Sequence, residues 1–307
     1  MSRRPTFTQD LDLVALIEDF GSEDKCRTYL EELRWPDGVR CPRCDSDKIS
    51  RIVKRHQFDC DVCRYQFSVT AGTIFNDSHL PLWKWFLAVY VMGESKKGIS
   101  ANQLKRMLRV SYKTAWYLCH RIRESMRDDA APYLMGIVEA DETYIGGKHP
   151  GQRGGRSLAF NKTAVLGAVE RGGEVRFRVT DRVNGKAIRS FLEAVVGDEA
   201  EAIYTDQFQS YRGIEDENTR HETVNHAAKQ WVQGDVHTNT IEGVWSLFKR
   251  GLIGSYHHVS VDHLPAYLDE MAFRYNNREN AYLFRDTLLR LIGAEPMPYA
   301  ELVAEGA

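Results

Sequence analysis

Four cysteines near the N-terminus constrain this chain more than any other feature. They form two C-x2-C pairs, Cys41 with Cys44 and Cys60 with Cys63, and 15 residues separate the pairs. Two tight turns at this spacing can present four thiolates tetrahedrally to one Zn²⁺ ion, and the bound metal supplies folding energy to a unit too small to bury a core of its own. Because protein then fills every ligand position, we predict one structural zinc per chain.

Other interpretations of the cysteines are weaker. A redox dithiol is the alternative for either pair alone, but two matched pairs so close together favour a metal site. Cys26 and Cys119 stand in apolar helical contexts, so we predict that they are core residues. Several basic residues lie on or beside the ribbon, which fits contact with phosphate, although many zinc ribbons bind protein instead.

Size and composition place the chain among globular proteins. It has 307 residues, of which 43% are hydrophobic and 27% charged, so there is room for two or three domains with packed cores. No apolar run approaches the roughly 20 residues of a membrane helix, and the N-terminal apolar stretch is short and contains Asp12. We therefore expect a cytoplasmic protein without a membrane partner, in a compartment where thiols stay reduced.

Charge is distributed unevenly, although the net charge is only −2. Residues 38–127 carry 17 Lys and Arg against 7 Asp and Glu, and residues 146–189 carry 10 against 3. Between them, residues 128–145 hold five acids and no base. Basic blocks around an acidic one are typical of a chain that binds nucleic acid, although solvated faces of an ordinary protein can give the same pattern.

Changes in composition divide the chain into four predicted parts. A helical segment over residues 1–37 ends at the breaker WPDG, and the zinc ribbon covers residues 38–70. Residues 79–128 have helical patterns. Residues 134–295 contain strand-like runs, a helix, a further strand and then helices, which predicts a mixed α/β layer domain. Gly146–Arg156 is a glycine-rich basic tract that could clamp DNA.

Residues 79–128 contain a candidate helix-turn-helix and so a predicted DNA-binding region. Ser100 and Gln103 have capping-box spacing at the start of one helix, and a second helix begins near Ser111. Apolar residues occupy one face of that second helix. Another face carries the three side chains that we predict to contact DNA, Lys113, Tyr117 and Arg121. A plain helical hairpin with a solvated basic face is the alternative.

Acidic residues occur in apolar surroundings at three distant places. By alternation Asp141 shares a strand face with Glu139, and Asp206 ends the apolar strand AIYTD. Glu242 stands seven residues before Lys249 in a helical pattern, so two turns place both on one face. A carboxylate in an apolar strand is costly to bury unless it is paired or bound to a cation. Three such groups at one end of a sheet could hold two hard cations for phosphoryl transfer.

Each acid also has a structural interpretation when it is taken alone. Asp141 fits a polar position on an edge strand, and Asp206 fits the cap of a following helix. Glu242 fits a capping box with Asn239. The combination with a zinc ribbon and basic flanks favours the functional interpretation.

At these residues the chain resembles the DDE-type transposases of bacterial insertion sequences, in particular the ISXO-like group with an N-terminal zinc ribbon. The matching segments stand in family order over about residues 20–280. They are CPRC with CDVC, VEADETYIGGK, YTDQFQSY, HTNTIEGVWSLFKRGLIGSYHHVS and YLDEMAFRYNNR.

The resemblance implies a multidomain α/β protein, in which a zinc ribbon and a helix-turn-helix precede an RNase H-like, mixed-sheet catalytic domain over residues 134–295. It identifies Asp141, Asp206 and Glu242 as the catalytic triad, binding two Mg²⁺ or Mn²⁺ ions per active site. It also identifies Lys249 as a DNA contact. Some relatives have Asn at the third position, so Asn239 remains a rival to Glu242. We expect Asn239 to cap its helix and Glu242 to bind metal.

The implied activity is metal-dependent DNA cleavage and strand transfer at the terminal inverted repeats of an insertion sequence. The expected partners are double-stranded DNA, as terminal repeat and as target, and further copies of the chain in a homodimer or larger assembly on DNA. We accordingly expect association with the nucleoid. Two other functions remain open: a catalytically retired DNA-binding regulator derived from a transposase, and another RNase H-like nuclease.

Overall fold

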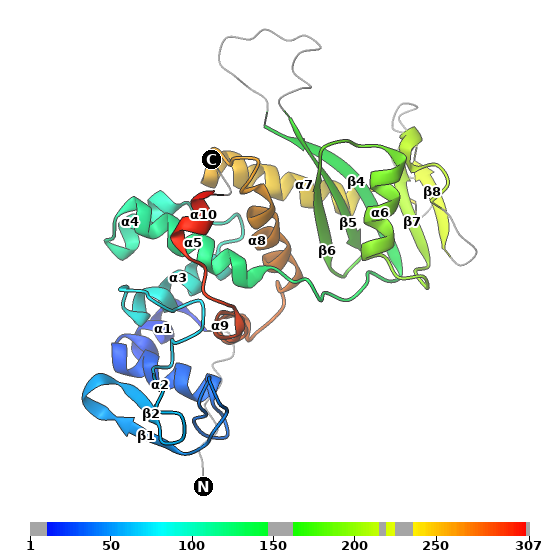
Figure 1. The fold of residues 1–307 in the computed structure, drawn as a ribbon. Helices are drawn as coiled ribbons and strands as arrows, with labels where there is room; N and C mark the ends of the chain where they lie inside the picture. The colour runs from blue at the N-terminus through cyan, green and yellow to red at the C-terminus, as the bar shows by residue number, and fades with distance from the viewer. Residues whose placement is uncertain (1–10, 147–161, 215–218, 225–235, 305–307) are drawn as a thin grey trace. The chain divides into compact units, whose positions relative to one another are not determined.

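The computed structural model describes residues 11–146, 162–214, 219–224 and 236–304. The chain divides into two compact units, whose elements are labelled in Figure 1. Unit 1 comprises Met1–Arg127 and Glu279–Ala307, and unit 2 comprises Asp128–Arg278. Among the described helices, none combines the length and the apolar character that crossing a bilayer requires.

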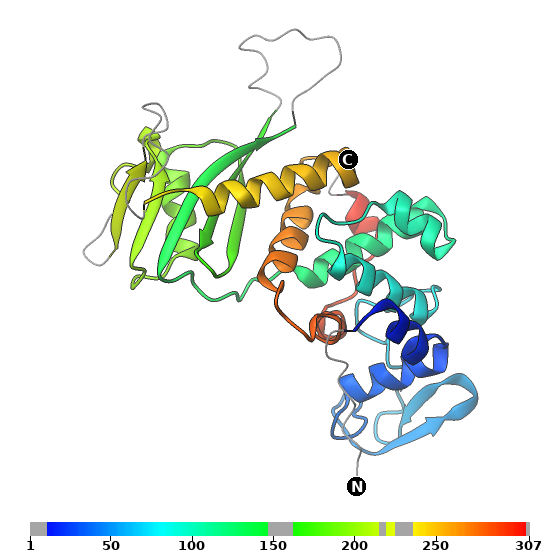
Figure 2. The ribbon, with the colours of Figure 1, turned by 180° about the vertical axis from the view of Figure 1, so that it is seen from behind.

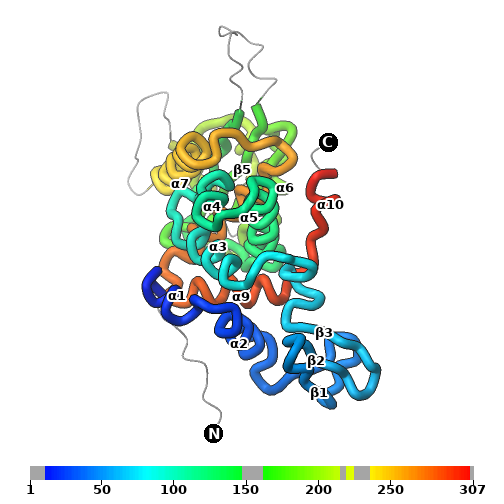
Figure 3. The backbone as a smooth tube through the Cα atoms, turned by 90° about the vertical axis from the view of Figure 1, so that its left-hand side faces the viewer, coloured from blue at the N-terminus to red at the C-terminus, as the bar shows by residue number. Residues whose placement is uncertain are grey.

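The second unit ends at Arg278, whereas the sequence predicts its end at residue 295. Beyond Arg278 the chain contributes α9 (Leu283–Gly293) and α10 (Tyr299–Ala304) to unit 1. The Phe284 ring of α9 lies 5.6 Å, centroid to centroid, from the rings of both Phe20 and Phe86. Figure 3 shows α9 beside the N-terminal helices. A helical pattern predicts a helix but does not reveal which core that helix joins.

The N-terminal part of unit 1 is helical. Its helices are α1 (Leu13–Phe20), α2 (Glu23–Arg34), α3 (Leu82–Glu94), α4 (Ala101–Leu108) and α5 (Tyr112–Met126). The helical segment predicted over residues 1–37 contains two helices, because the chain breaks between α1 and α2. A Cβ at Gly21 would lie 2.4 Å from the carbonyl oxygen of Ile17, and the Ser22 hydroxyl then accepts the Lys25 amide at the start of α2.

The zinc ribbon of unit 1 is a three-stranded antiparallel sheet of β1 (Ile49–Ile52), β2 (Gln57–Cys60) and β3 (Gln66–Phe67). Its core is small. The Trp35 ring packs edge-on against Phe58 and Phe67, with centroids 5.4 and 5.9 Å away. Because so few side chains are buried, the ribbon fits the expectation that this segment needs a metal to fold.

Unit 2 is built on a five-stranded mixed sheet in the order β6-β5-β4-β7-β8. Its strands are β4 (Ile137–Ile145), β5 (Thr163–Glu170), β6 (Val175–Thr180), β7 (Ala202–Asp206) and β8 (Arg220–Val224). β4, β5 and β6 are antiparallel, whereas β7 and β8 continue the sheet parallel to β4. This topology, with a helix between the third and fourth strands, is that of RNase H-like domains, so the predicted fold class is confirmed. β8 was not predicted.

Helices cover both faces of this sheet. On one face, Val138 and Ala140 of β4 belong to a core shared with α6 (Gly185–Val195). On the other, β5 packs against α7 (Asn239–Gly251) and α8 (Leu264–Asn276), and Figure 2 shows α7 running along the sheet. Glu139 and Asp141 alternate with Val138 and Ala140, so they point toward α7. The alternation predicted for this strand is therefore correct.

Candidate functional site

The four predicted zinc ligands converge in the ribbon. All four sulfur atoms lie within 4.8 Å of one another. The Sγ atoms of Cys41 and Cys63 are 3.6 Å apart, as are those of Cys44 and Cys60. A tetrahedral site with Zn–S bonds of about 2.3 Å requires sulfurs about 3.8 Å apart. The residues therefore fit a Zn²⁺ ion closely.

The two cysteine pairs are held by the same backbone turn. The Asp45 amide donates to the carbonyl oxygen of Cys41 at 2.8 Å, and the Arg64 amide donates to that of Cys60 at 2.8 Å. Both Asp45 and Arg64 adopt the left-handed conformation, with φ of 56° and 58°. Non-glycine residues rarely adopt it, so its occurrence at equivalent positions marks two equivalent metal-binding turns.

The predicted helix-turn-helix elements form as α4 and α5. The Ser100 hydroxyl accepts the Gln103 amide at 3.1 Å, and the Ser111 hydroxyl accepts the Thr114 amide at 3.1 Å, so a serine caps each helix. Arg109 turns the chain between the helices with a left-handed φ of 52°.

The predicted DNA contact at Arg121 is wrong. Arg121 is only 4% exposed, and its guanidinium donates to the carbonyl oxygens of Ile74 and, at 2.8 Å, Asn76. The same group lies 4.9 Å above the Trp85 ring. Arg121 thus ties α5 to the segment before α3. The sequence places it on a basic helix face but cannot show that other chain segments cover that face.

The C-terminal segment of unit 1 covers a second predicted contact. Tyr117 is half-buried, and its hydroxyl donates to the carbonyl oxygen of Met297. Lys113 remains exposed, with its ammonium 4.1 Å from the centre of the Tyr299 ring. Of the three predicted contacts, only Lys113 at the N-terminal end of α5 is open to solvent. Further exposed bases lie on α4 and in the following turn: Lys105, Arg106 and Arg109.

Asp141 is half-buried on β4, and α7 holds its carboxylate. The indole Nε1 of Trp245 donates to Asp141 Oδ2 at 3.0 Å. Gly167 lies opposite Asp141 on β5, where a Cβ would come within 2.4 Å of the Trp245 ring. Glycine at this position therefore gives the indole room to lie on the sheet and reach the carboxylate.

The surroundings of Asp141 disfavour its charge. Burial first, and then repulsion from Glu142 and Asp206, raise the pKa of Asp141 from 3.8 to about 7, against the opposing hydrogen bonds from the Glu142 backbone and from Trp245. Burial also raises the pKa of Glu142. A cluster of carboxylates with raised pKa values is the environment that a bound cation relieves.

Asp206 ends β7 beside Asp141. β4 and β7 run parallel and pair as far as Glu139 opposite Tyr204, two residues before each acid. Asp206 lies close enough to Asp141 for its charge to raise the pKa of Asp141. Asp206 Oδ1 also accepts the amide of Phe208 at 2.9 Å. Asp206 therefore also stabilises the turn that follows its strand, in line with the structural alternative for this residue.

Glu242 and Lys249 lie on α7 and are both exposed. They line a groove of about 460 Å³ together with Asp141, Glu142 and Trp245. Asp206 and Asn239 are outside the lining of this groove. The structure thus brings Asp141, Glu242 and Lys249 to one groove, and the charge of Asp206 acts on Asp141 from the end of β7.

The three carboxylates are less tightly gathered than the cysteines. Among the described residues, the four cysteines are the only group of three or more His, Cys, Asp or Glu side chains that could hold a metal. All their ligand atoms lie within 4.8 Å of one another. The predicted DNA-clamping tract Gly146–Arg156 lies outside the described residues from position 147 onward.

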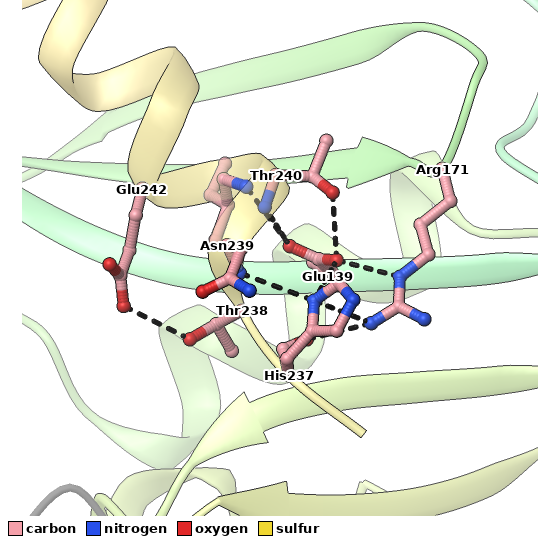
Figure 4. A network of polar contacts seen from close by, with 8 residues as sticks. Glu139, Arg171, His237, Thr238, Asn239, Thr240 and Glu242 are labelled. Atoms are coloured by element: carbon pink, nitrogen blue, oxygen red, sulfur yellow. Dashed lines mark hydrogen bonds and ion pairs between the residues drawn. The ribbon is translucent and has the colours of Figure 1, made fainter. Parts of the chain in front are cut away.

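The prediction that Asn239 caps α7 is wrong. The N-cap position belongs to Thr238, which makes no capping hydrogen bond with its side chain, and Asn239 is exposed in the first turn. Glu139 on β4 caps the helix instead, because its carboxylate accepts the amides of Thr240 at 2.7 Å and Ile241 at 3.0 Å (Figure 4). The sequence patterns did not predict this role of Glu139. An acid within an apolar strand was the available signal.

Residues 133–276 match the ISXO2-like transposase domain, and residues 21–66 match the transposase zinc-ribbon domain. The uncharacterized protein in transposable element ISH50 of Halobacterium salinarum is 32% identical over 275 residues, which span 84% of this chain and 92% of that relative.

Two solved structures resemble the chain at low scores. The Mos1 strand transfer complex has a TM-score of 0.31 at 15% identity and covers 68% of this chain and 75% of its own. The simian T-cell lymphotropic virus intasome, in complex with PP2A regulatory subunit B56 gamma, has a TM-score of 0.30 at 13% identity. That match covers 55% of this chain and 63% of the other, less than two thirds of its length.

Proposed function

The chain belongs to the ISXO2-like transposase family, and we propose that it binds the terminal inverted repeats of an insertion sequence and catalyses metal-dependent DNA cleavage and strand transfer. The observation that best supports this activity is that Asp141 of β4 and Glu242 of α7 line one groove, while Asp206 at the end of β7 is close enough to Asp141 to raise its pKa. Carboxylates from three distant segments provide the oxygen ligands that two-metal phosphoryl transfer needs.

Asp141, Asp206 and Glu242 fit Mg²⁺ or Mn²⁺ as ligands. Carboxylate oxygens suit these hard cations, and the burial and repulsion that raise the pKa of Asp141 to about 7 are relieved by a positive ion. When bound, such ions lower the pKa of an attacking water and stabilise the leaving oxygen of the phosphodiester.

Other side chains of the groove orient the Asp141 carboxylate and neutralise the phosphates of bound DNA. Trp245 fixes one oxygen of Asp141, which leaves the carboxylate in a defined orientation. Lys249 and Arg250 line the same groove and supply positive charge for the phosphates of a bound strand. The attacking groups are a water and then a DNA 3′-hydroxyl, so no protein nucleophile is required.

DNA recognition is assigned to unit 1. The exposed bases Lys105, Arg106, Arg109 and Lys113 lie on α4, in the turn and at the start of α5. The N-terminal residues of a recognition helix are those that reach base edges in a helix-turn-helix, so Lys113 keeps its proposed role and Arg121 loses it. Since two ends of the element must be processed, the proposed active form on DNA is a homodimer or larger assembly.

The deciding experiment uses the purified full chain and a linear duplex that carries the DNA flanking its own coding sequence. With Mg²⁺ or Mn²⁺, we expect cleavage at the element end followed by joining to a second DNA. Asp141→Asn, Asp206→Asn and Glu242→Gln should each lower the rate by at least about 10²–10³-fold, the scale for one essential electrostatic group, while DNA binding is kept.

Asn239→Ala is the matched control, because Asn239 is exposed on the first turn of α7 and does not line the groove. It should cleave like the unchanged protein. An active Glu242→Gln with a folded, inactive Asn239→Ala would make Asn239 the third ligand. DNA binding without any cleavage would favour the regulator, and cleavage without strand transfer would favour another nuclease of this fold.

A further inference from the structure

Glu139 is a fully buried acid, at 0% exposure, outside the proposed triad. Its Oε2 accepts the amides of Thr240 and Ile241, and its Oε1 accepts the Thr240 hydroxyl at 2.9 Å and the Arg171 Nε at 2.7 Å. Each carboxylate oxygen therefore has two donors. A buried charge this well satisfied holds its partners in a narrow range of positions, since displacing any of them leaves a charge unpaired.

Arg171 extends the contacts of Glu139 to two further segments. Its guanidinium donates to the carbonyl oxygen of His237 at 2.9 Å, just before α7. It also lies 4.8 Å from the centre of the Tyr204 ring on β7. Through its backbone amide, Arg171 is fixed to the carbonyl oxygen of Ile137 on β4. Figure 4 shows the resulting network, in which Glu139 and Arg171 join β4 to the start of α7.

Each proposed metal ligand stands two residues after a residue that belongs to the Glu139–Arg171 pair or is contacted by it. Glu139 itself precedes Asp141 on β4, Tyr204 precedes Asp206 on β7, and Thr240 precedes Glu242 on α7. In a strand, residues two apart point to the same face.

We propose that Glu139 and Arg171 are positioning residues. They set the relative placement of the three carboxylates by joining β4, β7 and α7 two residues before each of them. This inference rests on the proposed function, because it presupposes that the carboxylates act together. Neither residue touches substrate or metal in this role. Their effect is on the geometry of the groove, where a displacement of about 1 Å can cost on the order of 10²-fold in rate.

The test compares the unchanged full chain with Glu139→Gln. A glutamine keeps the volume of the side chain, but its NH₂ group cannot accept from an amide or from Arg171. We expect kcat for cleavage of the flanking-DNA duplex to fall by about 10²-fold, with KM for DNA unchanged and a higher Mn²⁺ concentration needed for half-maximal rate. Amide hydrogen exchange over residues 238–242 should accelerate.

Arg171→Lys is the second variant, since it keeps a charge beside Glu139 and loses the guanidinium fork. It should fold even if Glu139→Gln does not, and it should show a smaller loss of kcat with the same rise in Mn²⁺ requirement. Asn184→Ala is the control for simple destabilisation. Asn184 caps α6 by accepting the Ala187 amide at 2.9 Å, and α6 carries none of the three carboxylates. It should lower stability without changing kcat or the Mn²⁺ dependence.

The outcomes separate this inference from the proposed function. If the unchanged protein cleaves and Asp141→Asn does not, while both pair variants behave like Asn184→Ala, the positioning role is overturned and the function stands. If the unchanged protein does not cleave, the proposed function fails. The increase in melting temperature on adding Mn²⁺ then decides the inference: it is supported if the pair variants lose that increase and overturned if they keep it or if no protein shows it.

Discussion

At Asp141, burial and a hydrogen bond act in opposite directions on one carboxyl group. Burial and, after it, the like charges on Glu142 and Asp206 together raise its pKa to about 7, against the hydrogen bond that Trp245 donates. Because a cation reverses this balance, the unfavourable charge is the physical signature of a ligand site. The same balance makes the stability of the protein without added Mg²⁺ or Mn²⁺ depend on pH.

Asp141→Asn should therefore stabilise unit 2 at pH 8 more than at pH 5. Between pH 3.8, the ordinary pKa, and about 7, the native carboxyl holds a proton that the unfolded chain has lost. Stability then falls as pH rises, and the full penalty is present above pH 7. Each pKa unit corresponds to about 1.4 kcal/mol, so the gain at pH 8 is a few kcal/mol at most. Hydrogen exchange of β4 and β5 amides in urea, with zinc retained, measures it. An equal gain at both pH values would contradict the assignment.

Gly167 offers a second test at the scale of one residue. In Gly167→Ala the new methyl group meets the Trp245 ring, because the Cβ position lies 2.4 Å from it. We expect a loss of about 1–3 kcal/mol in unfolding free energy, as for other overpacked sites, and a decrease in cleavage rate as the indole leaves Asp141. Gly243→Ala on α7, where a Cβ meets nothing within 4 Å, is the matched control. A Gly167→Ala protein with unchanged stability would show that Trp245 is free to move.

Among the elements, α5 was predicted correctly as a helix, but only part of its predicted DNA-contacting face is exposed. Lys113→Ala should weaken DNA binding and reduce the slope of log K against log salt by about 1, with little change in melting temperature. Arg121→Ala should instead lower the unfolding free energy of unit 1 by about 2–3 kcal/mol, because two carbonyl oxygens lose a charged donor. Gel-shift titrations at several salt concentrations and urea unfolding separate the two effects. A stable Arg121→Ala protein with selectively lost DNA binding would restore the original prediction.

Local patterns predicted the parts of the molecule that local physics determines. The cysteine spacing predicts the ribbon because two short turns suffice to place four sulfurs, and alternation in β4 predicts the shared face of Glu139 and Asp141. The cap of α7 could not be predicted, since Glu139 is 101 residues from the amide of Thr240 that it accepts. Asn239 has the right residue type and spacing for a cap, but a buried charge from the sheet takes its place.

The zinc ribbon is the element whose stability should depend most on its ligand. Cys41→Ser or Cys63→Ser should unfold residues 38–70, because the ribbon core is small and four thiolates then lack their common partner. Unit 2 should stay folded, and binding of element-end DNA should weaken. Metal analysis should find about one zinc per chain in the unchanged protein and less in the variants, and Cys26→Ser should keep its zinc. A protein that holds no zinc and binds DNA equally well with and without a chelator would contradict the ribbon assignment.

For the whole molecule, chain order and spatial order differ. Unit 1 contains both the N-terminal and the C-terminal residues, and unit 2 is inserted between Arg127 and Glu279. Within unit 1, the amide of Ile74 donates to the carbonyl oxygen of Leu291 at 3.3 Å. Unit 1 is therefore completed only after unit 2 has been translated.

Deleting residues 279–307 should consequently unfold unit 1 and leave unit 2 folded. On α9, Leu288 and Leu291 are fully buried and Phe284 is 6% exposed. Burying each such side chain contributes about 1.5–3 kcal/mol, so losing three removes an amount comparable to the roughly 5–15 kcal/mol of a whole domain. A fragment of residues 1–127 should thus be unstable and bind DNA weakly, whereas the same fragment joined through a flexible linker to residues 279–307 should fold and bind. Circular dichroism, thermal melts and gel shifts on both fragments test this. Equal stability and DNA affinity of the two would show that the C-terminal helices are dispensable for unit 1.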